Sequence, residues 1–320
     1  MTIKARTLTQ KDSGRVTDRA FWFLCVGAGT IVLVVLAAIL VSTIRQSWPA
    51  ISDTGSNGFF SSKLWDPNTG KFGTLAFMFG TVVVSLLAVI LAVPVSIGIA
   101  LFLTELAHRR VKGLVVTLID LLASVPSVVF GLWGIFVFAP AMSPVYKWLH
   151  NTFGDIPVVG KLFGDVSPLN FMTAGIILAI MIVPIITSIT REVFDTVPEA
   201  DKQAAWALGA TRWEMIRGAV LPHSFGGIVG AVMLGLGRAM GETVAVALVI
   251  GASIQVTPNL LAPGYSIPAA IVNLFGESTG TFTAALVGMG VVLFIVTVIV
   301  NFLAQIVVRR AEIRMKGATA

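Results

Sequence analysis

Long uncharged apolar stretches recur along the chain, separated by short segments that carry the charged residues. About 20 apolar residues suffice to cross roughly 30 Å of hydrocarbon, and six stretches are at least that long. The expected spans are residues 20–44, 72–104, 114–138, 170–190, 224–254 and 281–308. Only the third and fifth contain charges, Asp120 in the third and Arg238 and Glu242 in the fifth. The pattern therefore predicts an all-α polytopic membrane protein with six transmembrane helices.

The composition supports this fold class and excludes several site types. Hydrophobic residues make up 56% of the chain and charged residues 12%, where soluble domains have about 25% charged residues. A single cysteine, Cys25, excludes a disulfide framework and a cysteine metal site. The three histidines, His108, His150 and His223, are scattered without ligand spacing. We expect neither a metal nor a cofactor.

The distribution of Lys and Arg predicts the orientation of the spans. The two tails, the second–third loop and the fourth–fifth loop together carry sixteen of them, and the remaining loops carry five. Since positive residues favour the cytoplasmic side, both termini should be cytoplasmic. The first span lacks a clear cleavage site and should be retained as an anchor. The expected domains are a tail over 1–19, a membrane domain over 20–310 and a tail over 311–320.

Arg238 and Glu242 are charged residues inside the fifth expected span. A charge near the bilayer centre costs at least about 2.5–3.5 kcal/mol, so it normally faces a partner, a cavity or a substrate path. Spacing of four should place both side chains on one helix face, where they can meet. The pair either neutralises itself or offers the guanidinium to a desolvated anion.

The loops on the two sides differ in character. The outer loops, 46–71 and 140–169, are rich in Gly, Pro, Ser, Asp and aromatic residues, and they either receive an external partner or form an inert surface. The inner loop, 191–222, predicts two short helices instead. Pro198 begins the first, Gly209 ends it, and a capping box from Thr211 begins the second, which should end before Leu221. This loop either docks on another protein or packs only on its own chain.

The inner loop also resembles a known signature. The pattern resembles the permease motif of ABC importers, Glu-Ala-Ala-x3-Gly-x9-Ile-x-Leu-Pro, with Gln203 in place of the glutamate and Ala219 in place of the isoleucine. The matching residues are Gln203, Ala204, Ala205, Gly209, Ala219, Leu221 and Pro222. The resemblance implies a type I ABC importer permease fold in which this loop couples to a cytoplasmic ATPase. The glutamine puts the polar contact of the usual glutamate in doubt.

Four further segments narrow the resemblance to phosphate ABC importer permeases, closer to the PstC type than to the PstA type. These segments are residues 72–75, 92–100, 124–134 and 238–243. The resemblance implies a permease subunit for inorganic phosphate, with Arg238 and Glu242 as the charged pair of the path. It further implies three partners: a PstA-like second permease, a PstB-like ATPase dimer and a PstS-like phosphate-binding protein outside the membrane. No Gly-x4-Gly-Lys-Ser/Thr loop occurs, so ATP hydrolysis should belong to a partner.

Several other residues are candidates with two interpretations each. The hydroxyls of Ser124, Ser127 and Thr243 either line the path or bond their own helix backbone. Asp120 favours a packing or interfacial role near the cytoplasmic edge. Four glycines are spaced for close helix packing rather than ligand binding, and these are Gly226, Gly230, Gly237 and Gly241.

Other transporter classes remain open on the sequence. A permease for sulfate or molybdate is the strongest alternative, because an arginine alone does not distinguish these oxyanions. A secondary anion transporter should show paired broken helices, which the sequence does not reveal. A channel has little use for a folded inner loop.

Overall fold

The computed structural model describes residues 14–157 and 159–317, and side-chain surroundings within these ranges except at 14–17, 56–57, 109 and 307–317. Contacts divide the chain into two units, residues 1–46 and 47–320, and each is described by itself. Among the described residues, six helical segments are long and apolar enough to cross a membrane. These segments are Asp18–Thr54, Leu75–Leu106, Ser127–Phe153, Phe171–Asp195, Arg212–Gly241 and Thr281–Ile306. The prediction of six spans is confirmed, and two of the predicted positions are wrong.

Helix α1 (Gly14–Thr54) accounts for the described part of the first unit. It is longer than the expected span 20–44 and continues through Pro49. Its most apolar window has no buried residue, and large side chains such as Leu24 and Leu33 are exposed. Exposed apolar residues on all sides are typical of a helix whose solvent is lipid.

The second unit begins with an ordered hairpin in the predicted outer loop 46–71. The elements here are α2 (Ser56–Ser61) and the antiparallel strands β1 (Trp65–Asp66) and β2 (Lys71–Phe72). In the turn, the carboxylate of Asp66 accepts hydrogen bonds from the Thr69 hydroxyl and the Asn68 amide, each at 2.9 Å. These bonds favour the ionised form and lower the pKa of Asp66. The loop is therefore held by local polar contacts at its turn and by the packing of Trp65 and Phe72 on Phe77 and Phe282.

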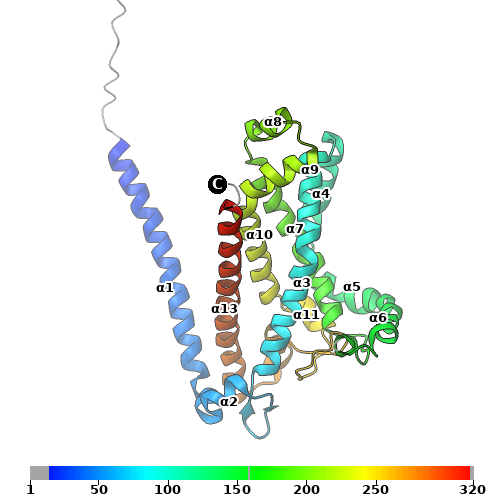
Figure 1. Ribbon diagram of the computed structural model, residues 1–320. Helices are drawn as coiled ribbons and strands as arrows, with labels where there is room; N and C mark the ends of the chain where they lie inside the picture. Colours follow the sequence, from blue (N-terminus) through cyan, green and yellow to red (C-terminus); the bar gives the residue numbers. More distant parts are fainter. Residues whose placement is uncertain (1–13, 158, 318–320) are drawn as a thin grey trace, which may run out of the picture. The chain divides into compact units, whose positions relative to one another are not determined.

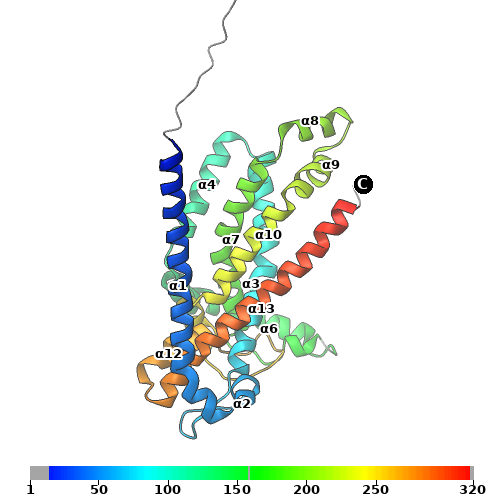
Figure 2. The same ribbon diagram turned by 90° about the vertical axis from the view of Figure 1, so that its left-hand side faces the viewer.

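Four helices form the core of the second unit (Figures 1 and 2). They are α3 (Leu75–Leu101), extended by the π-helical turn η1 (Phe102–Leu106), α7 (Phe171–Asp195), α10 (Leu221–Gly241) and α13 (Thr281–Gly317). Helix α3 packs along α7, and α10 packs on α7, α3 and α13. Asn170 caps α7 by accepting a 2.7 Å hydrogen bond from the Thr173 amide. Buried apolar residues from all four helices share one cluster, including Phe77, Ile182, Ala231 and Met289.

The third expected span, 114–138, is wrong. A separate helix, α4 (Arg109–Ser124), ends at Val125, which is extended because the following Pro126 disfavours the helical conformation. The apolar segment Ser127–Phe153 then runs continuously through α5 (Ser127–Trp133), the π-helical turn η2 (Gly134–Phe138) and α6 (Ala139–Phe153). Part of the expected outer loop 140–169 is therefore helix, and the described residues of the rest include the short helix η3 (Gly160–Leu162).

The fifth expected span, 224–254, is wrong at both ends. The helix starts earlier, because α9 (Arg212–Met215), the π-helical turn η4 (Ile216–Val220) and α10 are continuous, and it ends at Gly241. A short helix, α11 (Val244–Val249), follows, and then an irregular loop that two backbone bonds between Ile250, Ser253 and Gly264 close on itself. At Gly251, with φ of +93°, a Cβ atom would lie 2.6 Å from the Pro263 side chain, so glycine is required.

The two ends of the second unit carry different elements. Helix α8 (Glu199–Ala207) lies with α9 at one end, and α2 and α12 (Ile267–Leu274) lie at the opposite end (Figure 2). The short helix η5 (Phe275–Glu277) joins α12 to α13, which runs back toward the end that carries α8. The predicted inner loop 191–222 and the predicted outer loop 46–71 thus lie at opposite ends of this unit.

Candidate functional site

Arg238 lies in the last turn of α10, and Glu242 lies just beyond the end of that helix. The expectation that both share one helix face is wrong, because Glu242 is the C-cap residue and has an extended backbone with φ of −69° and ψ of 129°. In the described part of the chain, no ion pair joins the two side chains. The pair therefore does not neutralise itself within this chain.

Both charged residues border one open hollow of about 710 Å³, which we call the Arg238 hollow. Its wall comes from α7, α10 and α13, and it is lined by Ile185, Met233, Leu234, Gly237, Arg238, Gly241, Glu242 and Asn301. Most of this wall is apolar or glycine, so a few polar groups determine what can occupy it. This combination is typical of a binding site for a small polar ligand.

Burial distinguishes the two charges. Arg238 is exposed on the free face of α10, whereas Glu242 is only 9% exposed. Glu242 also borders a second, small gap beside Thr81, Ser85 and Ser266. The guanidinium is thus the accessible group, and the carboxylate forms part of the wall behind it.

Asn301 is a residue of the Arg238 hollow that the sequence reasoning missed. It lies on α13, and its Oδ1 atom is buried without a hydrogen-bond partner in the described part of the chain. An amide inside a membrane helix is costly unless it is paired, because hydrocarbon offers no hydrogen bonds. The signal was present in the sequence, since Asn301 is a lone amide in the apolar run from Val298 to Leu303.

The predicted hydroxyl residues of the path are not gathered at the Arg238 hollow. Ser124 is exposed at the end of α4 and donates to its own helix at the Leu121 carbonyl, at 2.7 Å. Ser127 begins α5, and neither serine lines the hollow. Thr243 is next to Glu242 and donates to the Gly241 carbonyl at 3.2 Å. Backbone bonding is therefore the observed state of Ser124 and Thr243.

The glycines of α10 fall into two sets. A Cβ atom at Gly226, Gly230, Gly237 or Gly241 would meet no atom within 4 Å, so these four do not pack within this chain. The close contacts involve different glycines: a Cβ at Gly227 or Gly235 would approach side chains of α7 within 2.8 Å. The prediction of a packing role for the first set is therefore wrong inside this chain, and that face of α10 is open.

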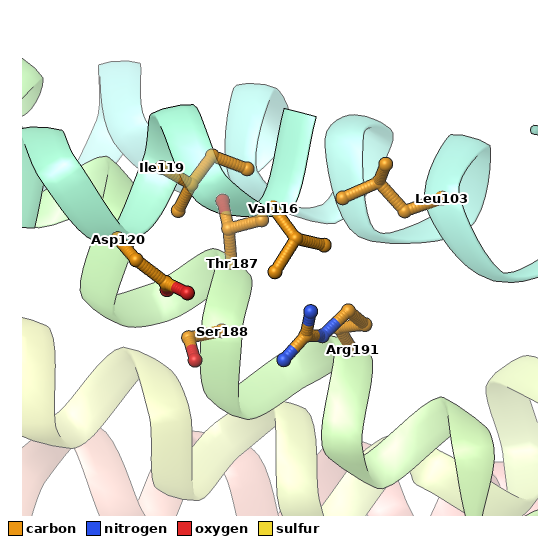
Figure 3. Close-up of a pocket in the computed structure, with 7 residues that line it drawn as sticks. All are labelled: Leu103, Val116, Ile119, Asp120, Thr187, Ser188 and Arg191. Carbon is orange, nitrogen blue, oxygen red and sulfur yellow. The ribbon is translucent and has the colours of Figure 1, made fainter. Parts of the chain in front are cut away.

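Asp120 lies away from the Arg238 hollow, in a small gap of about 10 Å³ between α4 and α7. In Figure 3 its carboxylate and the Arg191 guanidinium extend toward this gap from the two helices, with Thr187 and Ser188 between them. A gap of this size holds about one water molecule. The structure thus agrees with a packing position for Asp120.

The second functional candidate is the stretch from Pro198 to Pro222, which we call the 198–222 segment. Helix α8 begins one residue after Pro198 and ends at Ala207, and Gly209 adopts φ of +81°, as predicted for a helix stop. The predicted capping box is confirmed, because Thr211 and Glu214 bond each other's backbone amides. The predicted end before Leu221 is wrong, since the helix continues through Pro222 into α10.

The outer surface of the 198–222 segment exposes large apolar side chains among its charged residues. Leu208 is 89% exposed, Trp213 61% and Trp206 47%. Of the motif residues, Gln203, Ala204 and Gly209 are exposed, and Ala205 is half-buried against the inner side. Large exposed apolar residues beside small ones are typical of a surface that contacts another protein.

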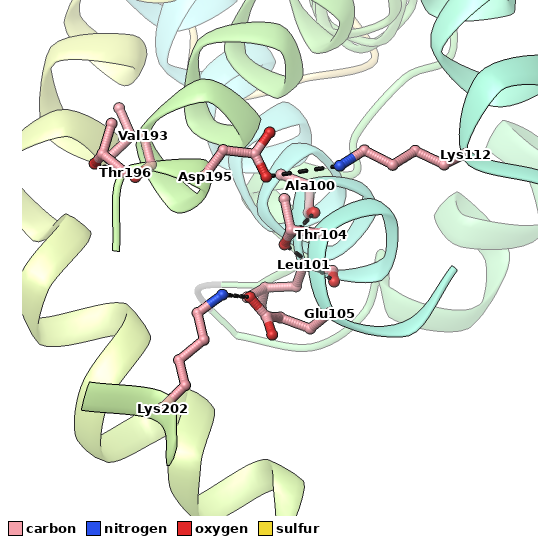
Figure 4. Close-up of polar contacts among 9 residues, drawn as sticks. All are labelled: Ala100, Leu101, Thr104, Glu105, Lys112, Val193, Asp195, Thr196 and Lys202. Carbon is pink, nitrogen blue, oxygen red and sulfur yellow. Dashed lines mark hydrogen bonds and ion pairs between the residues drawn. The ribbon is translucent and has the colours of Figure 1, made fainter. Parts of the chain in front are cut away.

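The inner side of the 198–222 segment is fixed to the membrane helices. Met215, Ile216 and Val220 are buried in a cluster with Ala100 of α3 and Phe194 of α7. In addition, Lys202 Nζ lies 2.6 Å from Glu105 Oε1 in η1, with side chains only 12% and 8% exposed (Figure 4). Sequence reasoning missed this ion pair because its members are 97 residues apart.

The sequence of this chain is similar to those of known membrane transport proteins. The model of the family described as binding-protein-dependent transport system inner membrane component matches residues 92–313. The phosphate transport system permease protein PstC of Xylella fastidiosa is 43% identical, over 92% of this chain and 91% of that protein. The protein of the same name from Mesorhizobium japonicum is 42% identical, over 93% and 92%.

Two solved structures share the fold. A bacterial ABC transporter involved in the import of the acidic polysaccharide alginate aligns with a TM-score of 0.58 at 18% identity, over 92% of this chain and 98% of that chain. The methionine ABC transporter MetNI in an inward-facing conformation aligns with a TM-score of 0.52 at 16% identity, over 73% and 94%. The fold is that of type I ABC importer permeases. The chain thus belongs to the family of inner-membrane components of binding-protein-dependent transport systems, as a multi-pass permease subunit whose ATP hydrolysis belongs to a separate subunit.

Proposed function

We propose that this chain is a permease subunit of an ATP-driven importer of inorganic phosphate and that the Arg238 hollow forms its half of the anion path. The observation that carries the proposal is Arg238 itself, a permanent charge in an apolar helix that no carboxylate of the described chain pairs. Such a charge needs an external counter-charge in the membrane. Relatives that are 42–43% identical bear the name of phosphate transport permeases, which supports phosphate as that anion.

Arg238 supplies the attraction in this path. Its guanidinium presents planar paired donors that match two phosphate oxygens, and it stays charged at every physiological pH. A hydrated phosphate can exchange water for these donors as it enters the apolar hollow. The positive charge thereby lowers the free-energy barrier that the surrounding Met233 and Leu234 side chains impose on an anion.

Glu242 and Asn301 limit how tightly the anion is held. The Glu242 carboxylate borders the same hollow and opposes a second negative charge, so the anion is attracted to Arg238 without being trapped. Asn301 adds a neutral amide that donates to phosphate oxygens or accepts from a phosphate hydroxyl. Conduction requires a site strong enough to enter and weak enough to leave.

The path needs a second wall. The hollow is open and Gly226, Gly230, Gly237 and Gly241 leave the same helix face uncovered, which suits the close approach of a homologous, PstA-like permease. In this arrangement a PstS-like binding protein delivers phosphate at the end that carries α2. A PstB-like ATPase dimer docks on the 198–222 segment, contacting Gln203, Ala204 and the exposed Trp206 and Leu208.

The same proposal fixes the orientation and the domain limits. Both termini and the 198–222 segment are cytoplasmic, since the Lys and Arg residues concentrate there. The tails cover 1–19 and 311–320, and the membrane domain covers 20–310. External labelling of cysteines introduced at Asn57 and Ala204 tests this orientation: the first should react in intact cells and the second should not. Reaction at Ala204 alone contradicts the docking role.

The function is tested by uptake into proteoliposomes that contain the complete transporter. Phosphate should accumulate only when ATP is present on the side of the membrane that carries the ATPase and when the phosphate-binding protein is present on the other side. Sulfate and molybdate, each supplied with its own concentration series, should not accumulate. If sulfate or molybdate accumulates and phosphate does not, that oxyanion is the transported substrate and the assignment of phosphate is wrong.

A further inference from the structure

Within the described chain, α8 has one short polar link to α3, the ion pair between Lys202 and Glu105. Its nitrogen–oxygen distance of 2.6 Å is that of a strong charge-assisted hydrogen bond. Both side chains are mostly buried, at 12% and 8% exposed, so water and salt screen the bond much less than they screen a surface pair. The pair therefore behaves as a fixed connection rather than as a surface contact.

The pair joins α8 to the π-helical turn at the end of α3. Glu105 belongs to η1, the π-helical turn that ends α3, and π-helical turns interrupt regular helix geometry, frequently at functional sites. A second π-helical turn, η4, leads from α9 into α10. Leu101, beside η1, and Ile216 and Val220 of η4 share one apolar cluster. Both helices thus have a π-helical turn at the end nearest α8.

The path from this end to the Arg238 hollow is continuous. Helix α3 packs along α7, and both pack on α10, which carries Arg238. The contacts therefore form one chain of packed elements from α8 through Lys202, Glu105 and α3 to α7 and α10. Coupling between distant sites travels through such packed, rigid elements.

We propose that the Glu105–Lys202 pair is a coupling strut, which transmits the movement of α8 to α3 and so links ATP hydrolysis to opening and closing of the Arg238 hollow. This inference rests on the proposed docking of the ATPase on the 198–222 segment. Both residues are positioning residues, since neither lines the hollow and their side chains are only 12% and 8% exposed.

The chain offers a matched control in the Lys112–Asp195 pair, which joins α4 to α7 near the same end (Figure 4). Its atoms lie 3.6 Å apart, and its side chains are 37% and 53% exposed. Exposed ion pairs contribute little, because water and salt screen them. The two pairs therefore differ in burial while sharing residue chemistry and location.

The test measures phosphate transported per ATP hydrolysed in the complete reconstituted transporter, alongside the yield of the assembled complex. Lys202→Met and Glu105→Gln should each lower that ratio at least about fivefold, the lower end of a coupling effect between two sites. Lys202→Arg should retain most of it. Lys112→Met should match the wild type in both measurements.

A variant that neutralises both residues separates transmission from folding. Each single change leaves a buried charge without a partner, which can lower complex yield, whereas Glu105→Gln combined with Lys202→Met leaves none. The strut hypothesis expects this double variant to assemble at wild-type yield and to remain uncoupled. Wild-type coupling in the double variant, or an equal loss in Lys112→Met, would overturn it.

The result also separates the strut from the function on which it rests. If the wild-type transporter imports no phosphate or retains no ATPase, the proposed function fails and the ratio is undefined. If the wild type imports phosphate and every strut variant keeps its ratio, only the strut fails. Charge exchange, Glu105→Lys with Lys202→Glu, should restore the ratio to within about twofold, because the opposite charges meet again.

Discussion

The Arg238 hollow and the 198–222 segment differ in whether their central polar groups have partners within the chain. In the 198–222 segment, Lys202 pairs with Glu105, and the Glu214 carboxylate accepts from Thr211, so these two charged groups have partners within the chain. In the Arg238 hollow, Arg238 and Glu242 stay apart and the Asn301 oxygen has no partner in the described chain. The first arrangement builds a stable shape, and the second leaves polar groups available for a ligand or partner.

The difference shows which region can tolerate change. A polar group that has a hydrogen-bond partner stabilises the folded chain, so its removal first lowers the local stability. An unsatisfied polar group in an apolar wall contributes little to the folded chain alone, so its loss should appear in transport.

The largest effect is expected at Arg238. Arg238→Gln removes the charge and the paired donors, and phosphate uptake should fall at least about 100-fold, since hydrogen bonds to charged groups are each worth about 1.5–3 kcal/mol. Arg238→Lys keeps the charge without the planar geometry and should restore uptake only partly. Uptake is measured in proteoliposomes and normalised to the yield of the assembled complex.

Glu242 provides the control for Arg238. Because no ion pair joins the two residues in this chain, Arg238→Gln should leave complex yield near that of the wild type, and so should the double change with Glu242→Gln. The double variant should still not transport. If instead the single change prevents assembly and the double change recovers uptake, the two residues form a structural pair and the anion role is wrong.

Gly209 should show a large effect of the structural kind. An alanine at φ of +81° places a Cβ atom in a left-handed conformation, which costs roughly 1–2 kcal/mol, although no atom lies within 4 Å of that position. Gly209→Ala should therefore destabilise the junction of α8 and α9 and increase hydrogen exchange of both helices. Gly218→Ala is the matched control, since Gly218 also has open space but an ordinary φ. Equal exchange in the two variants would contradict the strain argument.

Asn301 should show a smaller effect of the ligand kind. Asn301→Leu removes one neutral donor and acceptor from the hollow, and uptake should fall about fivefold, the worth of about 1 kcal/mol of hydrogen bonding. Complex yield should not fall, because the removed oxygen has no partner in the described chain. Phe302→Leu, on the neighbouring side chain that is 62% exposed, is the control and should leave uptake unchanged. A loss of yield in Asn301→Leu would instead assign the amide to the interface between permeases.

Local signals predicted much of the 198–222 segment and failed near the Arg238 hollow. Gly209 and the Thr211–Glu214 box act within a few residues, so the sequence reveals them. Pro126 was also a local signal, and its effect on Val125 was overlooked when the third span was predicted. The family signature located the segment as a whole, but it carried no information on Lys202 and Glu105.

The end of α10 has only a weak local signal, Gly241, and the segment after α11 is held by contacts between residues distant in sequence. The Gly264 amide donates to the Ile250 carbonyl, and the Ile267 amide donates to the Thr81 hydroxyl at 2.9 Å. Such bonds join residues up to 186 positions apart. For the same reason the sequence did not predict that Arg238 and Asn301 line one hollow, because this requires the packing of α10 on α13.

The smallest effect is expected at Thr211, whose hydrogen-bond partner in the 198–222 segment, Glu214, belongs to the same short helix. Thr211→Ala removes the hydroxyl that accepts from the Glu214 amide and should cost about 0.5 kcal/mol, the low end for a helix cap, because the site is exposed. Hydrogen exchange of α9 should increase slightly, and phosphate uptake and complex yield should stay unchanged. Thr211→Ser keeps the hydroxyl and should restore protection. A loss of uptake in Thr211→Ala that Thr211→Ser repairs would show that the cap itself takes part in coupling, and the separation between structural and ligand-facing polar groups would then not hold for this segment.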